Sequence, residues 1–242
     1  MSEPLLRVED LVASYGQLQA VRGVSFEVGA GEALAVIGEN GAGKTTLFQS
    51  ICGLHGAATG DVVFAGEPVR GLAAHDIVRR GIALVPEGRR IFPSLTVDEN
   101  LRVAEDQHRS RGRARSSRPR RWSRDRVYEL FPDLRAAAAR GGHQISGGQQ
   151  QMLAIGRALL SEPTLLLFDE VSLGLSPAVV KVLYQALAAI RADGVTLVFV
   201  EQDVQRSLAF SDHLVCLHKG TVRLAGASRS RSLEEVRRAY FG

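Results

Sequence analysis

The 242-residue sequence contains only two cysteines, Cys52 and Cys216, and six histidines. Two cysteines are too few for a disulfide framework, and neither stands in a C-x-x-C motif or another metal-ligand spacing. The histidines form no H-x-x-x-H pair or other ligand cluster, so a histidine metal site is not expected. We therefore expect both cysteines to pack as small, reduced, apolar side chains.

Long apolar runs are also missing. None approaches the roughly 18 residues that are needed to span a bilayer, and the first residues, MSEPLLRVEDL, mix charged and apolar types instead of forming a leader. The sequence therefore predicts neither a transmembrane helix nor a signal peptide. We expect a protein that stays in the cytosol and acts alone or docked to another molecule. Its 45% hydrophobic content can fill a substantial core in one domain or two.

Lysine is scarce, with three residues against 27 arginines, and the arginines are concentrated. Residues 109–126 contain nine Arg and one Asp, a local charge of +8 in a chain of net +4, which leaves −4 for the remainder. Ser, Gly and Pro interrupt this segment without an apolar period, which predicts a solvated, flexible loop. Contact with nucleic-acid phosphates or anionic lipid is the alternative. Trp122 is the segment's only aromatic residue and no nucleic-acid-binding fold is recognisable, which disfavours nucleic acid.

The stretch GENGAGKTT, residues 38–46, fits the phosphate-binding pattern G-x-x-x-x-G-K-[ST]. An apolar segment at 33–37 predicts a buried strand before it, and residues 45–52 predict a helix after it. Glycines carry no Cβ, so the loop can aim its backbone N–H groups at a phosphate, together with those of the helix start. Lys44 can reach the β- and γ-phosphates, and the Thr45 hydroxyl can bind Mg²⁺.

Two further motifs follow within about twenty residues of each other. Residues 146–148, Ser-Gly-Gly, precede a predicted helix at 150–160 and provide a second helix start suited to phosphate. The apolar run 164–168 ends in Asp169-Glu170, the Walker B pattern. Asp169 can hold Mg²⁺ directly or through water, and Glu170 is placed to accept a proton from an attacking water.

The other periodicities predict a mixed α/β chain with antiparallel strands before the phosphate loop. A turn is expected at 59–60, a helix end at Pro132 and a loosened connection at Gly141-Gly142. Further strands are predicted at residues 5–13, 20–28, 61–65, 82–85, 195–200, 212–218 and 221–225. Further helices are predicted at residues 74–80, from 96 onward, and at 127–131, 177–190 and 233–241.

Two positions each admit two interpretations from the residues alone. Tyr15 lies in a turn near the phosphate loop, where its ring could stack on a base or could be an ordinary turn tyrosine. Glu87 follows a strand's carboxyl end, where ligand-contacting groups gather in α/β sheets. It could offer an oxygen to Mg²⁺ or to water, or form a surface salt bridge with Arg89 or Arg90.

The ordered set of Walker A, ISGGQ and Walker B resembles the ATP-binding subunits of ABC transporters over essentially the whole chain. Within that family, residues 86–92, 127–131, 151–157 and 172–175 are similar to the branched-chain amino-acid importer ATPase of the LivF type. The urea-importer ATPases are the nearest rivals.

This resemblance implies an α/β fold, with a P-loop NTPase core around a parallel sheet, an N-terminal antiparallel β-subdomain and an inserted helical subdomain. One ABC nucleotide-binding domain would cover residues 1–242. Residues 1–88 and 161–242 would form the ATP-binding core. Residues 89–160, which include the Arg-rich segment, would form the helical subdomain that docks the coupling helix of a permease.

The resemblance also implies how ATP is bound. In this family two domains pair head to tail, and each ATP lies between one Walker A and the partner's signature. Tyr15 would stack on adenine, while Ser146 and Gly148 would contact the γ-phosphate bound by the other subunit. The remaining nucleotide-binding positions would be Gly38, Asn40, Gly41, Ala42, Gly43, Lys44, Thr45 and Thr46 in the loop, and Gly147 and Gln149 in the signature.

Catalytic and metal positions follow from the same resemblance. Glu170 is similar to the catalytic base, and Gln202 stands at the switch position, where His is usual. Glutamine can hydrogen-bond a γ-phosphate or orient water, but it carries no positive charge. Val171 stands where Pro is usual. The implied Mg²⁺ side consists of Thr45, Asp169 and Glu87, the last at a position where most of the family has Gln.

The resulting prediction is the ATPase subunit of an importer, with ATP and Mg²⁺ as cofactors, in which ATP closes the dimer and hydrolysis reopens it. Its partners would be a second ABC ATPase, two transmembrane permease subunits and, indirectly, an extracytoplasmic solute-binding protein, at the cytoplasmic face of the membrane. Alternatives are a urea or amide importer ATPase and an ATPase whose Arg-rich loop binds nucleic acid. Missing heptads disfavour a DNA-repair ATPase, and a missing N-K-x-D motif disfavours a GTPase.

Overall fold

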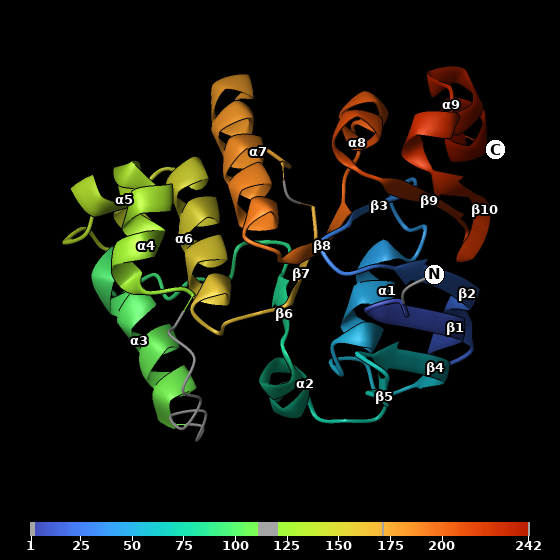
Figure 1. The fold of residues 1–242 in the computed structure, drawn as a ribbon, viewed down its shortest axis with the longest axis horizontal. Coiled ribbons are helices and arrows are strands. Elements are labelled where there is room, and N and C mark those ends of the chain that lie inside the picture. Colours follow the sequence, from blue (N-terminus) through green and yellow to red (C-terminus); the bar gives the residue numbers. More distant parts are fainter. Residues whose placement is uncertain (1–2, 111–120, 171, 242) are drawn as a thin grey trace.

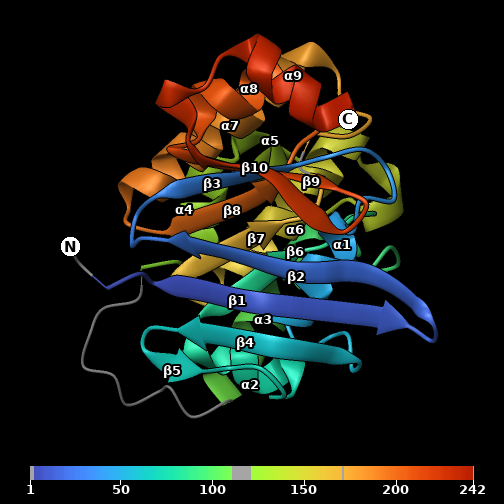
Figure 2. The same cartoon turned by 90° about the vertical axis from the view of Figure 1, so that its right-hand side faces the viewer.

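Two β-sheets organise the computed structural model, which describes residues 3–110, 121–170 and 172–241. One sheet has the strand order β2-β1-β4-β5, and the other has the order β10-β9-β3-β8-β7-β6. Figure 2 shows the two sheets one above the other. The predictions made for residues 111–120 of the Arg-rich segment and for Val171 lie outside the described residues.

The first sheet is antiparallel, as the alternating sequence predicted. Its strands are β1 (Leu6–Tyr15), β2 (Leu18–Val28), β4 (Ala58–Phe64) and β5 (Glu67–Pro68). The turn predicted at 59–60 is wrong, because both residues lie within β4. The pairing of β1 with β4 shifts register there, and Gly60 has φ +90°. A Cβ on Gly60 would lie 2.3 Å from the Asp10 carbonyl oxygen, so this irregularity requires glycine.

The second sheet is parallel except for its last strand. Its strands are β3 (Ala33–Ile37), β6 (Ile82–Val85), β7 (Leu165–Phe168), β8 (Thr196–Val200), β9 (His213–His218) and β10 (Thr221–Ala227). β3 pairs in parallel with β8 and β9, and β7 pairs in parallel with β6 and β8. All residues of β3, β7 and β8 are buried, since helices or the other sheet cover both faces. Their carboxyl ends therefore meet at one edge.

Helices surround this sheet on both sides (Figure 1). α1 lies between the two sheets, while α3 to α6 gather at the other end of the molecule. The helices of the core are α1 (Lys44–Ile51), α2 (Ala74–Arg80), α7 (Pro177–Ala192), α8 (Val204–Phe210) and α9 (Leu233–Phe241). The gathered helices are α3 (Val97–Ser110), α4 (Arg124–Leu130), α5 (Pro132–Ala136) and α6 (Gly147–Leu159). No helix among the described residues is long and apolar enough to cross a membrane.

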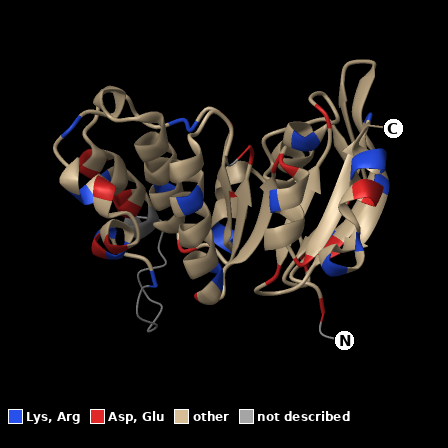
Figure 3. Cartoon of the chain, turned by 90° about the horizontal axis from the view of Figure 1, so that it is seen from above, with Lys and Arg blue, Asp and Glu red and all other residues tan. Residues whose placement is uncertain are grey.

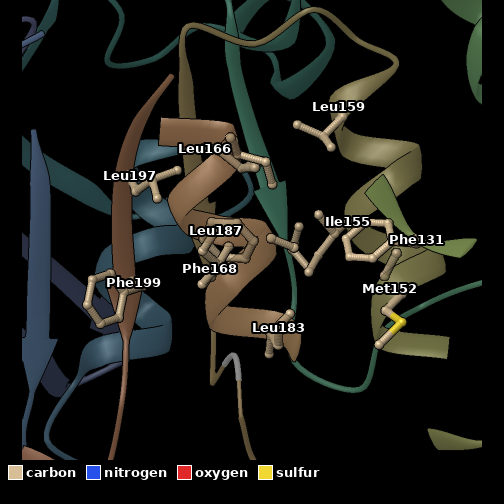
Figure 4. Packing of buried hydrophobic residues seen from close by; sticks show 14 of the residues in the cluster. Phe131, Met152, Ile155, Leu159, Leu166, Phe168, Leu183, Leu187, Leu197 and Phe199 are labelled. Carbon is tan, nitrogen blue, oxygen red and sulfur yellow. The ribbon is translucent and has the colours of Figure 1, made fainter. Parts of the chain in front are cut away.

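Side chains on the two faces of the parallel sheet pack into two separate hydrophobic clusters. Along β7, Leu165 and Leu167 face α1 and the antiparallel sheet, whereas Leu166 and Phe168 face α6 and α7. Figure 4 shows Phe168 beside Leu187 of α7. Because the second cluster joins the gathered helices to the sheet, it fixes where α6 begins relative to the core. Cys52 and Cys216 are free and buried, as predicted.

Two local predictions around the gathered helices are wrong. α4 begins at Arg124, inside the predicted loop 109–126, because the Ser123 hydroxyl accepts a hydrogen bond from the Arg126 N–H at 3.2 Å. The helix end predicted at Pro132 is confirmed, because α4 ends at Leu130 with Phe131 as its C-cap, and Pro132 then begins α5, since proline suits the first helical position. The connection at Gly141-Gly142 is not loose. Gly142 is buried in a 3₁₀ turn, and a Cβ there would lie 2.9 Å from the Phe92 carbonyl oxygen.

Candidate active site

The phosphate loop joins β3 to α1 and depends on glycine at both ends. Gly38 has φ +152° and Gly43 has φ +100°. A Cβ on Gly38 would lie 2.3 Å from the Leu217 carbonyl oxygen, and one on Gly43 would lie 2.3 Å from that of Ala20. Neighbouring strands therefore approach the loop too closely for any side chain at these two positions.

The other predicted loop residues lie between these glycines or just after them. Gly41 has φ +81°, and a Cβ there would meet nothing within 4 Å. Ala42 is buried, and its carbonyl accepts a hydrogen bond from the Gly220 N–H at 3.0 Å. Thr46 is buried in the first turn of α1. The turn between β9 and β10 therefore helps to hold the loop in place.

Lys44 is folded back over the loop. Its ammonium donates to the carbonyl oxygens of Gly38 at 2.6 Å and Glu39 at 2.8 Å. Burial lowers its pKa, whereas the carboxylates of Glu170 and Asp169 act to raise it. The ammonium therefore lies where a phosphate oxygen can replace the two carbonyls as its partner.

Thr45 and Asp169 meet at the edge of the sheet. The Thr45 hydroxyl donates to Oδ1 of Asp169 at 3.2 Å. Burial raises the pKa of Asp169 to about 6, the Thr45 hydrogen bond opposes this, and the charges of Glu170 and Glu87 add to it. A bound cation would stabilise the ionised form of this carboxyl, which is buried beside two other acids.

Glu87 lines a cavity of about 780 Å³ together with Thr45 and Asp169. Among the described residues no ion pair joins Glu87 to Arg89 or Arg90, and Arg89 donates to Gln150 at 3.0 Å instead, so the alternative of a surface salt bridge is wrong. In the described chain, no group of three or more His, Cys, Asp or Glu residues could hold a metal alone. The oxygens of Thr45, Asp169 and Glu87 nevertheless suit Mg²⁺, which takes one or two carboxylates plus phosphate and water.

Glu170 and Gln202 lie side by side. The Gln202 amide donates to Oε1 of Glu170 at 3.1 Å and also contacts Oδ1 of Asn40 at 3.5 Å. Glu170 has φ +56°, a left-handed conformation that costs energy for a residue with a Cβ. The phosphate loop, the end of β7 and the end of β8 are therefore linked through side chains.

The signature residues begin α6. Ser146 caps the helix, since its hydroxyl accepts from the Gln149 N–H at 3.3 Å and its own N–H donates to Oε1 of Gln149 at 3.0 Å. A Cβ on Gly148 would lie 2.7 Å from a Val179 methyl group, and one on Gly147 would lie 3.0 Å from the Arg89 guanidinium. Figure 1 places α6 among the gathered helices and α1 between the sheets. The structure thus does not bring the signature to the phosphate loop of the same chain.

Tyr15 ends β1 and is half exposed. Its hydroxyl donates to Oε1 of Gln49 at 3.3 Å, and its ring packs on His55 with 4.6 Å between ring centroids. His55 is held in turn by a contact of 3.0 Å with the Ser14 carbonyl. No motif pointed to His55, because it lies in a loop between predicted elements.

Glu201 is a second residue that sequence reasoning passed over. It follows β8 directly, only 3% of it is exposed, and the Ser172 and Tyr184 hydroxyls hydrogen-bond it. Its only sequence signal is an acid at the end of a continuous apolar strand.

Comparison with known proteins agrees with this geometry. The family profile "ABC transporter" matches residues 21–172. The chain belongs to the ABC transporter family. The protein "High-affinity branched-chain amino acid transport ATP-binding protein BraG" of Pseudomonas aeruginosa is 40% identical over 240 residues, covering 98% of this chain and all of the relative. "Probable branched-chain amino acid transport ATP-binding protein LivF" of Archaeoglobus fulgidus is 34% identical, covering 93% and 92%.

Solved structures show the same ABC fold. "Structure of ATP binding subunit of ABC transporter" aligns with a TM-score of 0.81 at 29% identity, over 98% of this chain and all of that one. A dimeric post-hydrolysis cassette bound to ADP and Pi aligns with a TM-score of 0.78 at 26% identity, over 94% of this chain. The predicted family, the α/β ABC fold and an ATP-hydrolysing activity are thereby confirmed.

Proposed function

We propose that this chain is the ATP-hydrolysing subunit of an importer for branched-chain amino acids. Full-length similarity to BraG and LivF supports the transported class. The observation that carries the hydrolytic role is the hydrogen-bonded contact of Glu170 with Gln202, beside the contact of Thr45 with Asp169. These pairs lie at one edge of the parallel sheet, next to the phosphate loop.

The phosphate loop binds ATP. Its backbone N–H groups and the start of α1 hold the phosphates, and Lys44 exchanges its carbonyl partners for phosphate oxygens. Thr45 and Asp169 would hold Mg²⁺, with Glu87 on the same cavity wall. Mg²⁺, when bound, neutralises charge on the phosphate groups. Tyr15 offers an exposed ring, backed by His55, for the adenine base.

Hydrolysis uses Glu170 as the general base, which accepts a proton from the attacking water. Gln202 holds the Glu170 carboxylate through its amide N–H and remains neutral while doing so. The contact of Gln202 with Asn40 ties this pair to the phosphate loop. Proton transfer therefore depends on the position of two side chains and not on the charge of a switch residue.

A second ATPase subunit completes the site. The N-terminus of α6, with Ser146, Gly147, Gly148 and Gln149, is far from its own phosphate loop in the fold (Figure 1). The N–H groups of Ser146 and Gln149 are engaged in the capping box, so the γ-phosphate held by a partner would be bound by the remaining groups of this helix start. This arrangement accounts for two phosphate-binding helix starts in one chain.

Residues 89–160 form the helical subdomain of a single nucleotide-binding domain, and residues 1–88 and 161–242 form its ATP-binding core. A groove of about 430 Å³ lies where α2 and the loop after β6 approach the gathered helices. It receives a permease segment, which places the chain peripherally at the cytoplasmic face of a membrane. Groove residues include Ala74, Val78, Arg90, Ala104, Arg157 and Ala158.

The hydrolytic role is tested by Glu170→Gln, which keeps the shape of the side chain and removes its basicity. We expect this variant to bind ATP as the wild type does and to hydrolyse it at least ~100-fold more slowly. We also expect it to accumulate as a dimer. Wild-type turnover in Glu170→Gln would overturn the role of Glu170.

The paired arrangement is tested by cysteine crosslinking between Glu39→Cys and Ser146→Cys in the Glu170→Gln background. Glu39 is an exposed loop residue, whereas Gly43 cannot carry a side chain. The native Cys52 and Cys216 are buried and serve as a background control. An interchain crosslink that forms only with trapped ATP is expected, and its absence with ATP bound would contradict the arrangement.

The transported class is tested in proteoliposomes that hold the chain with its genomic permease neighbours and binding protein. We expect uptake of leucine, isoleucine or valine to depend on ATP and on Glu170. Uptake of urea without uptake of these amino acids would contradict the proposal and support the urea importer.

A further inference from the structure

Glu201 is an acidic residue that is buried in the protein interior, where acidic residues are rare. It follows β8 immediately, and only 3% of its surface is exposed. Isolated buried carboxylates are costly, so such a residue is retained only with compensating partners. The proposed roles of Glu170 and Gln202 leave this carboxylate without a function.

The Glu201 carboxylate is fully engaged by donors from three parts of the chain. The Ser172 hydroxyl lies 2.8 Å from each oxygen, and the Tyr184 hydroxyl donates to Oε2 at 2.8 Å. The backbone N–H groups of Gln202 and Asp203 donate to Oε1 at 3.1 and 3.2 Å. Through these hydrogen bonds the carboxylate connects α7 and the loop after β7 to the backbone at residues 202 and 203, which include the switch position.

Arg206 of α8 compensates the charge. Its guanidinium lies 3.7 Å from Oε1 of Glu201 and donates to the Ser172 hydroxyl at 3.2 Å. It also lies over the Tyr184 ring, 5.6 Å from the centroid. Burial, followed by the Glu201 charge, raises the pKa of Tyr184, which keeps this hydroxyl a donor.

These contacts bracket the Glu170–Gln202 pair. Ser172 lies two residues after Glu170, and Gln202 follows Glu201 directly. The pair itself is separated by 3.1 Å, and a cavity of about 210 Å³ is lined by both residues together with Ser172, Glu201 and Arg206. Fixing the two backbones on either side of the cavity fixes the distance between the two side chains.

We propose that Glu201 is a positioning residue for ATP hydrolysis, which holds the loop after β7 against the switch so that Glu170 and Gln202 stay in contact. The inference rests on the proposed function, because it assumes that this pair performs hydrolysis. Small displacements of a general base are costly, and a misplacement of about 1 Å can lower a rate about 100-fold.

A carboxylate is required because two oxygens accept four hydrogen bonds. Glutamine at position 201 offers one acceptor oxygen and turns an NH₂ group toward donors. If the oxygen keeps the backbone N–H groups, the Tyr184 hydroxyl loses its acceptor and the Ser172 hydroxyl keeps only one of its two. Glu201→Gln therefore weakens the contact that holds the loop after β7, while it nearly preserves the volume of the side chain.

The decisive experiment measures kcat, KM for Mg-ATP and the melting temperature of Glu201→Gln, Ser172→Ala and the double variant. We expect Glu201→Gln to lower kcat by roughly 10- to 100-fold with KM changed less than about threefold. Ser172→Ala should lower kcat similarly, and the double variant should be no worse than Glu201→Gln, because both act through one contact. Glu234→Gln, at an exposed site on α9, is the matched control and should leave kcat unchanged.

Amide hydrogen exchange gives a readout that does not depend on turnover. In Glu201→Gln, the amides of Gln202 and Asp203 should exchange faster, whereas the amides of β8 should keep their protection. An unchanged kcat in Glu201→Gln would overturn the inference. So would a fall in kcat that is accompanied by an equal loss of protection throughout β8, which would indicate a purely structural role.

The two proposals fail in different ways. If Glu170→Gln hydrolyses ATP at the wild-type rate, the proposed catalytic pair is wrong. If Glu170→Gln is inactive and Glu201→Gln is fully active, only the inference about Glu201 is wrong.

Discussion

Thr45, in the first turn of α1, donates a hydrogen bond of 3.2 Å to Asp169, the residue that follows β7. The two residues are 124 positions apart in the chain. They meet because β3 and β7 are parallel to β8 on its two sides, which brings α1 and the end of β7 to the same edge. In the proposed site, these two oxygens would bind one Mg²⁺ ion.

Asp169→Asn should therefore separate metal use from nucleotide binding. Asparagine keeps the size of the side chain and removes the charge that attracts Mg²⁺. We expect kcat to fall at least ~100-fold, while ATP binding without Mg²⁺ changes less than about threefold, because Lys44 and the loop are unaltered. Titration of ATPase activity with Mg²⁺ measures the first effect, and nucleotide fluorescence measures the second. A wild-type Mg²⁺ titration in Asp169→Asn would contradict the assignment.

Thr45→Val tests the other oxygen of this pair. Valine preserves the branched shape and removes the hydroxyl, so we expect a higher Mg²⁺ requirement with little change in stability. Thr59→Val, at an exposed position in β4, is the matched control and should behave as the wild type.

Gln202 gives a prediction about pH. Because an amide does not titrate, the wild-type pH–rate profile should show no ionisation of the switch residue. Gln202→His should introduce one near pH 6.5, the ordinary pKa of histidine. Gln202→Ala should lower kcat by roughly 10-fold or more through loss of the contact with Glu170. Profiles of kcat between pH 5.5 and 8.5 check this, and superimposable profiles of the wild type and Gln202→His would contradict it.

Local sequence was sufficient where one strand or helix carried its own pattern. The predicted bounds agree with the structure for two strands and two helices: Ala33–Ile37, Ile82–Val85, Ala74–Arg80 and Leu233–Phe241. Continuous apolar runs indicated buried parallel strands, and the carboxyl ends of these strands indicated where the site would form.

The remaining features depend on contacts that no local pattern records. Trp122 lies in the Arg-rich segment, yet it is buried, its backbone N–H donates to Glu162 at 2.7 Å, and Arg126 lies over its ring. Only the fold brings Glu162 to it. Helix α8 was not predicted, and the Glu201 contacts were missed because Ser172 and Tyr184 are distant in sequence.

Cys52 gives a second pH prediction, for stability. Burial raises the pKa of this thiol from 9.0 to about 12, so the folded state holds its proton more tightly than the unfolded state. When folding raises the pKa of an acid, the folded protein loses stability as the pH rises, beginning at the pKa that the group has in the unfolded state. The free energy of unfolding should therefore fall by about 1.4 kcal/mol per pH unit from pH 9 toward 11 through this group.

Cys52→Ala isolates that contribution. We expect its stability to fall less steeply above pH 9 than that of the wild type, so the difference between the two should shrink by about 1.4 kcal/mol per unit. Urea unfolding at pH 8, 9, 10 and 10.5 measures both slopes. Parallel slopes for the two proteins would show that the thiol does not titrate differently on folding.

Arg124 should stabilise the gathered helices, although its segment was predicted to be a solvated loop. Its guanidinium contacts both oxygens of Asp98 at 2.9 and 3.0 Å and donates to the buried Glu105 carboxylate at 3.0 Å. Tyr128 donates to the same Asp98 at 2.9 Å. Figure 3 shows such basic and acidic residues interspersed on these helices.

Removing Arg124 leaves a buried acid with one partner fewer. Because Arg124 and Asp98 are partly exposed, most of the cost comes from Glu105, and we expect Arg124→Ala to lose about 1–2 kcal/mol. Arg102→Ala, on the exposed Asp106 pair of α3, is the matched control and should lose less than ~0.5 kcal/mol. Urea unfolding followed by circular dichroism compares the two. Equal losses in both variants would mean that the Glu105 contact adds nothing beyond an exposed ion pair.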